Sequence, residues 1–143
     1  PDAPPTQGPA DQVAAIRETL EETGLGIAFS RPVTADEAAK LRAVAIADGF
    51  ETALGRSGLT LALDTMVPFA RWCPRFEGAF DTRFFLHDVG TGAVTTEVDA
   101  VENTHLFWAS ASEVLARADG GDLNVIFPTR CNLLRLAQFS SFT

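Results

Sequence analysis

The chain has 143 residues, the size of one domain, and its 46% hydrophobic residues, with eleven Phe among them, supply ample material for a core. Nineteen acidic against eleven basic side chains give a formal net charge of −8, which opposes binding to nucleic acid and to anionic membranes. Small phosphorylated molecules are not excluded, because acidic side chains hold divalent cations that in turn hold phosphate oxygens.

Neither the cysteine content nor the hydropathy pattern indicates export or membrane insertion. Cys73 and Cys131 lie far apart and in no paired spacing, so neither a disulfide framework nor a zinc ribbon is indicated. No apolar run approaches the ~20 residues of a membrane-spanning helix, and no charged-then-apolar leader opens the chain. We therefore expect a soluble cytoplasmic protein with two reduced thiols.

A proline-rich tail precedes the first expected helix. Residues 1–10 have the composition of a linker or of the tail of an inserted loop, and we expect a single domain over 11–143. The first helix is expected from Asp11, a candidate N-cap, to about Thr23. Gly24 fits the left-handed position that ends such a helix.

Two more helices are expected in the first half of the chain. Thr34 and Glu37 have the spacing of a capping box and predict a helix that runs to about Asp48. A short third helix is expected from about Phe50 to Arg56, where a Ser-Gly pair follows.

The middle of the chain changes to the β-branched and aromatic pattern of strands. A tight turn is expected at 90–92, where two glycines flank a threonine. The expected strands are Leu59–Leu63, Met66–Trp72, Thr82–His87 and His105–Trp108.

Helix signals return in the last third of the chain. Ser110 and Glu113 have capping-box spacing, and Pro128 suits the first turn of a helix. The expected elements are a helix from Ser110 to about Ala118, a short strand at Leu123–Phe127 and a helix from about Thr129 to Phe139. Because helices and strands interleave without a strict βαβ order, we expect an α+β or a layered α/β domain.

The first expected helix carries three carboxylates on one face. At about 100° per residue, Glu18, Glu21 and Glu22 lie within about 100° of one another and opposite Ile16 and Leu20. Such like charges repel on an isolated helix, and toward its C-terminus they also oppose the helix dipole. Hard cations such as Mg2+ or Mn2+ bind oxygen ligands of this kind. The alternative is the solvated acidic face of an ordinary amphipathic helix.

The segment from Arg17 to Leu25 resembles the second half of the Nudix box, Arg-Glu-aliphatic-any-Glu-Glu-any-Gly-aliphatic. The matching positions are Arg17, Glu18, Glu21, Glu22, Gly24 and Leu25, whereas Thr19 replaces an aliphatic residue. The resemblance implies a Nudix-like α/β/α sandwich with a mixed sheet between helices. It also implies that Glu18, Glu21 and Glu22 hold Mg2+ or Mn2+ and that Arg17 orients a glutamate.

Further segments resemble a split-box Nudix subgroup related to the acyl-coenzyme A diphosphatases. They are Phe69–Pro74, Phe80–Leu86, Trp108 and Pro128–Phe139. Pro9 and Ala3 stand where an uninterrupted box has its upstream Glu and Gly. The resemblance therefore implies that the first half of the box and the family's N-terminal strands precede Pro1.

The implied activity is that of a hydrolase acting on acid anhydrides. A Nudix pyrophosphatase cleaves the pyrophosphate bond of a nucleoside diphosphate linked to another moiety, and the subgroup points to coenzyme A or acyl-coenzyme A. Bound metals would neutralise phosphoryl charge and lower the pKa of the attacking water. Glu102, or Glu97, is our candidate for the catalytic base beside Arg17 and Glu18, and a solvated loop acid is the alternative for each.

Six other residues are candidates for substrate contact. They are His87, His105, Arg71, Arg83, Trp72 and Phe84. The histidines and arginines would bind the substrate and its phosphates, and the aromatic rings would stack on an adenine. The alternatives are strand-end histidines, arginines that pair with some of the many acids, and aromatic rings that pack in the core.

A non-catalytic Nudix-like domain that binds a nucleotide or a partner is the alternative function, since the first half of the box is missing in register. A structural domain with an acidic helix is the third reading. We expect a small nucleoside diphosphate derivative as partner, with no nucleic acid and no membrane, and we leave a homodimer open.

Overall fold

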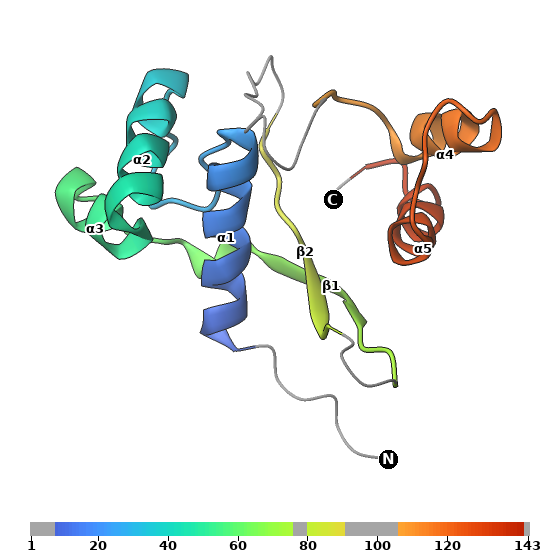
Figure 1. The fold of residues 1–143 in the computed structure, drawn as a ribbon, viewed down its shortest axis with the longest axis horizontal. Helices are drawn as coiled ribbons and strands as arrows, with labels where there is room; N and C mark the ends of the chain where they lie inside the picture. Colours follow the sequence, from blue (N-terminus) through green and yellow to red (C-terminus); the bar gives the residue numbers. More distant parts are fainter. Residues whose placement is uncertain (1–7, 76–79, 91–105, 142–143) are drawn as a thin grey trace. The chain divides into compact units, whose positions relative to one another are not determined.

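The structure, a computed structural model, describes residues 8–75, 80–90 and 106–141. Over these residues it contains five α-helices, one 3-10 helix and a small two-stranded antiparallel sheet (Figure 1). This composition confirms the α+β class. The chain divides into two compact units, one from Pro1–Arg71 with Arg83–Leu106 and the other from Trp72–Thr82 with Phe107–Thr143.

Helix α1 (Pro9–Thr23) opens the first unit and ends where the sequence predicts. Gly24 has φ 72° and donates its N–H to the Leu20 carbonyl oxygen at 3.0 Å. The N-cap is Gly8, so the expected N-cap at Asp11 is wrong by three residues. The reason is that the Asp11 carboxylate reaches back and accepts the Gly8 N–H at 3.2 Å, which gives an acid inside the first turn a capping role.

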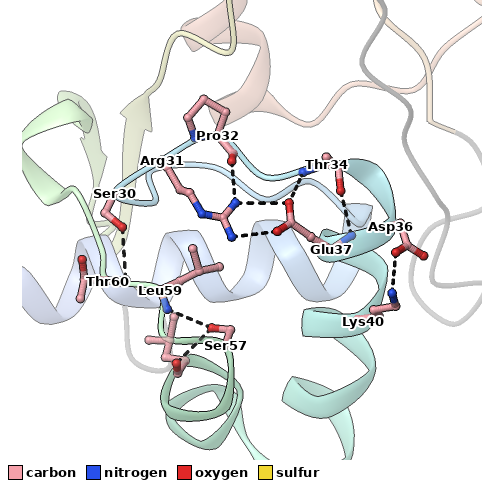
Figure 2. Close-up of polar contacts among 11 residues, drawn as sticks. Ser30, Arg31, Pro32, Thr34, Asp36, Glu37, Lys40, Ser57, Leu59 and Thr60 are labelled. Carbon is pink, nitrogen blue, oxygen red and sulfur yellow. Dashed lines mark hydrogen bonds and ion pairs between the residues drawn. The ribbon is translucent and has the colours of Figure 1, made fainter.

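Helices α2 (Ala35–Asp48) and α3 (Phe50–Ser57) follow, as predicted. Thr34 Oγ1 accepts the Glu37 N–H at 3.2 Å, and Glu37 Oε2 accepts the Thr34 N–H at 2.9 Å, so the predicted capping box is confirmed (Figure 2). Gly49 separates the two helices at φ 94°, in the region that favours glycine.

The core of the first unit is built on the apolar face of α1. Ile16 and Leu20 are 0% exposed, and they fix the rotation of the helix about its axis. The other buried members of this core are Ala28, Phe29, Ala38, Leu41, Ala45, Phe50, Ala53, Leu59 and Met66. The predicted apolar face of α1 is therefore confirmed, and its opposite face is left for solvent or ligand.

Only some of the expected strands are present among the described residues. Strands β1 (Val67–Trp72) and β2 (Thr82–Leu86) pair with each other and confirm two of the predictions. The expected strand at 59–63 is wrong, because that segment makes only an antiparallel bridge between Phe29 and Leu61 before a 3-10 helix at Leu63–Thr65. Its partner segment runs into Pro32, which has no N–H with which to extend the pairing.

The second unit contains two helices among its described residues. Helices α4 (Ala111–Asp119) and α5 (Phe127–Leu136) confirm the last two helix predictions, and Ser110 Oγ caps α4 by accepting the Glu113 N–H at 3.2 Å. The strand expected at 123–127 is wrong, because Phe127 begins α5. The strand expected at His105–Trp108 is not formed over 106–108, and His105 lies outside the described residues.

The part of the chain that the structure describes contains no helix long and apolar enough to span a bilayer.

Candidate functional site

Helix α1 carries the three glutamates of the motif on the side away from its buried stripe. Because Ile16 and Leu20 face the core, the Glu18 side chain is 58% exposed and the Glu21 side chain is 30% exposed. Glu22 is half-buried one turn beyond Glu18. All three carboxylates therefore remain on the outer side of the helix, as the periodicity predicts.

Arg17 lies between two of these carboxylates. Its Nη2 is 3.1 Å from Glu18 Oε1, and its Nε is 3.9 Å from Glu21 Oε2. The Nε atom is shielded from solvent and has no hydrogen-bond partner within the described residues. The guanidinium thus orients the Glu18 carboxylate by a charge-assisted hydrogen bond and holds Glu21 by charge alone.

A second arginine reaches the same helix from α2. Arg42 donates from Nε to the main-chain carbonyl oxygen of Glu21 at 2.8 Å. This bond satisfies one of the carbonyl groups that the end of a helix leaves without an intrahelical partner. It also places a cation at the negative end of the helix dipole, where Glu21 and Glu22 are otherwise unfavourable.

A cavity of about 650 Å3 adjoins this face of α1. Arg17 and Glu21 line it from α1, and Asp48 and Glu51 line it from the junction of α2 and α3. Asp48 also pairs with Arg56 at 2.5 Å. No sequence signal marks Asp48 and Glu51 as members of the site, because they approach α1 through helix packing across about thirty residues and not through a local spacing.

The donor chemistry of this face fits a hard divalent cation, although no ready-made cage is present. Within the described ranges, no three His, Cys, Asp or Glu side chains come together as a group that could hold a metal ion. Mg2+ is commonly held by one or two carboxylates together with waters and substrate phosphates. Glu18, Glu21 and Glu22 can supply ligands of that kind from a partly exposed helix face.

A second cavity, of about 400 Å3, is lined by the loop after α1, the start of α2 and the segment 87–89. His87 directly follows β2 and is part of this lining. His87 Nε2 accepts the Ala28 N–H at 3.3 Å, and Nδ1 lies 3.3 Å from the Thr65 carbonyl oxygen. Since Nε2 accepts, the proton belongs on Nδ1, and both ring nitrogens serve the backbone. This arrangement supports the alternative of a structural strand-end histidine.

Two other sequence candidates contact residues other than the three glutamates. Arg83 pairs with Asp11 in the first turn of α1, which supports the acid-pairing alternative. Trp72 packs edge to face against Phe127 in the second unit, with ring centroids 5.6 Å apart, which supports a packing role. Both candidates for the catalytic base, Glu102 and Glu97, lie outside the described residues.

No protein-family model, no curated protein and no solved structure matches the chain. The motif on α1 and the geometry of that helix are therefore the observations that bear on function.

Proposed function

We propose that the chain is a Nudix-type hydrolase that uses Mg2+ or Mn2+ to cleave the pyrophosphate bond of a nucleoside diphosphate linked to another moiety. Coenzyme A and acyl-coenzyme A are the first substrates to test. The proposal includes a Nudix-like α/β/α arrangement, of which the described chain shows the α+β class. The observation that carries it is the Arg17–Leu25 motif on α1, with its carboxylates turned outward and its end set by Gly24.

The proposed chemistry assigns separate tasks to the residues of α1. Glu18, Glu21 and Glu22 hold the divalent cation, which supplies positive charge to the phosphoryl oxygens and lowers the pKa of a bound water. Arg17 fixes the Glu18 carboxylate through their 3.1 Å contact and keeps Glu21 on the same side of the helix. Glu102 is proposed to accept the proton of the attacking water.

The end of α1 supports this assignment mechanically. Gly24 lets the chain leave the helix in a left-handed turn, and Arg42 holds the carbonyl group of Glu21. A helix end fixed at both points limits the movement of the carboxylates that precede it. Catalysis by a metal site depends on such positioning, because a ligand displaced by about 1 Å can cost about 100-fold in rate.

A non-catalytic nucleotide-binding domain is the second candidate. It is favoured by the lack of a three-carboxylate group among the described residues. Such a domain would bind the diphosphate derivative without turning it over.

The test is a panel of diphosphate substrates offered to the full-length protein with Mg2+ or Mn2+. We expect hydrolysis by the parent protein and its loss in Glu21→Gln/Glu22→Gln. Asp64→Asn, which removes an exposed carboxylate from the 3-10 helix, is the control and should hydrolyse at the parent rate. A parent that binds a diphosphate but hydrolyses none supports the second candidate. An active double variant contradicts the assignment of the glutamates.

A further inference from the structure

A third cavity, of about 300 Å3, lies between α2 and α3 and is separate from the acidic face of α1. Its apolar wall consists of Leu41, Val44, Ala53 and Leu59. Leu41, Ala53 and Leu59 are buried members of the main core, and Val44 packs against that core. The wall is therefore fixed by packing, which is typical of preformed sites for small molecules.

Basic side chains surround the mouth of this cavity. Arg31, Lys40 and Arg56 line it, so three of the eleven basic residues of a chain with net charge −8 meet here. Each of these three side chains is at least half exposed. Arg31, Ser57 and Leu59, all drawn in Figure 2, line this cavity together. Cations and apolar groups thus face one small volume.

The acids that accompany these cations are placed unequally. Glu37 lines the cavity and binds Arg31 through two contacts, at 2.8 and 3.3 Å. Asp36 and Asp48, which pair with Lys40 and Arg56 at 2.5 Å each, are not part of the lining. Three cations and one anion line the cavity, and Asp36 and Asp48 balance Lys40 and Arg56 from just outside the lining.

Lys40 and Arg56 retain donors for another anion. Within the described residues, Arg56 donates to Asp48 from Nη1. A guanidinium carries five N–H donors, so further donors of Arg56 remain for a ligand. Lys40 uses one of its three ammonium protons on Asp36. The neighbouring Asp36 raises the pKa of Lys40, so the ammonium group stays charged. Arg31, in contrast, is engaged in the two-point contact with Glu37.

We propose that this cavity binds a small amphiphilic monocarboxylate. The apolar body lies against Leu41, Val44 and Leu59, and the carboxylate lies at Arg56 and Lys40. The size supports this class, since about 300 Å3 is at the lower end of the volumes of ligand cavities. The remaining donors of Lys40 and Arg56 support it as well, because an apolar cation or a neutral chain of equal length would make no charge-assisted hydrogen bond with them.

Three probes of equal chain length test the proposal on the full-length protein: octanoate, octanol and octylammonium, each below the concentration at which it forms micelles. Binding is followed by NMR shifts of the methyl groups of Leu41, Val44 and Leu59. We expect saturable shifts with octanoate, weaker ones with octanol and none with octylammonium. Equal responses to octanoate and octylammonium, or no saturable response to octanoate, would overturn the proposal.

Variants of opposite sign test the role of charge. Lys40→Gln/Arg56→Gln should weaken octanoate binding about tenfold and leave octanol unchanged, since only the anion uses these donors. Asp36→Asn/Asp48→Asn removes the competing carboxylates and should strengthen octanoate binding. If neither pair of substitutions changes the octanoate affinity, or if both change it in the same direction, the proposed contact at Lys40 and Arg56 is wrong.

Discussion

Arg42 on α2 donates from Nε to the carbonyl oxygen of Glu21 at 2.8 Å, and so connects a second helix to the C-terminal turn of the motif helix. The bond joins residues 21 positions apart in the sequence. It satisfies a carbonyl group and adds positive charge where two glutamates stand near the negative end of the helix dipole. The position of the acidic face therefore depends on packing between α1 and α2 as well as on the helix itself.

Replacement of Arg42 by Met should expose this dependence. Met keeps an apolar stem but donates no hydrogen bond, so we expect the free energy of unfolding to fall by about 1–2 kcal/mol. Urea titration followed by far-UV circular dichroism measures the change. Arg75→Met, on an exposed residue of the second unit, is the matched control and should have almost no effect. An equal loss in the two variants would show that the Glu21 carbonyl contact contributes nothing specific.

Gly26 makes a second prediction, because no side chain fits at its position. A Cβ added there would lie 2.4 Å from Val33 Cγ2, closer than two non-bonded carbon atoms approach each other. Gly26→Ala should therefore destabilise the first unit by about 1–3 kcal/mol. Gly55→Ala, in helix α3 with open space around the new Cβ, should instead stabilise the protein by about 0.5–1 kcal/mol.

The double variant Gly26→Ala/Val33→Ala separates the clash from other causes. Val33→Ala removes the Cγ2 atom, so it should recover part of the stability that Gly26→Ala loses. Unfolding free energies of the four proteins in this cycle give the coupling between the two sites. Strict additivity would mean that the contact with Val33 is not the source of the destabilisation.

The local signals in the sequence predicted the helices of the first unit well, because caps and stops act over a few residues. Thr34 with Glu37 begins α2, and Gly24 ends α1. The same locality explains the error at Asp11, since an acid at the third helical position makes a capping bond that resembles that of an N-cap. The strand expected at 59–63 failed for the opposite reason, because pairing depends on a partner elsewhere in the chain.

The candidate site likewise contains residues that local periodicity predicts and residues that only helix packing brings together. Periodicity alone placed Glu18, Glu21 and Glu22 on one face, because 3.6 residues per turn fix their directions once the apolar stripe is buried. The approach of Asp48 and Glu51 to Arg17 depends on how α1 packs against the junction of α2 and α3. No spacing within the sequence encodes that approach, because it arises only when the helices pack.

Glu37 provides a pH-dependent prediction. Its pKa falls to about 2, mainly because the Arg31 side chain donates hydrogen bonds to it, with the Thr34 N–H as a further donor. A lowered pKa means that the ionised carboxylate stabilises the fold above the unfolded pKa of about 4.3 and that this contribution disappears as the pH falls through about 2. Glu37→Gln should therefore be less stable than the parent at neutral pH.

Thermal unfolding at a series of pH values measures the difference between the two proteins. It should stay constant from neutral pH down to about pH 5, shrink between about pH 4 and pH 2, and be smallest at the acid end. Asp64→Asn, which changes an exposed carboxylate of the 3-10 helix, serves as the control and should follow the parent over the whole range. A Glu37→Gln difference that grows as the pH falls would contradict the contact with Arg31.

Arg17 is proposed as a positioning residue, and its variants separate that role from a structural one. The ion pairs with Glu18 and Glu21 are partly exposed, so Arg17→Gln should change the unfolding free energy by less than about 1 kcal/mol. The proposed hydrolysis should nevertheless lose about 100-fold in kcat, and the affinity for Mn2+ should fall, because the Glu18 carboxylate is no longer oriented.

Arg17→Lys keeps the charge without the planar guanidinium. It should therefore restore part of the rate and part of the Mn2+ affinity that Arg17→Gln loses. Initial rates with Mg2+ or Mn2+, together with a Mn2+ titration of each variant, provide both readouts. A variant that loses stability and activity in parallel, or one whose Mn2+ affinity equals that of the parent, would assign Arg17 to the fold and not to the orientation of Glu18.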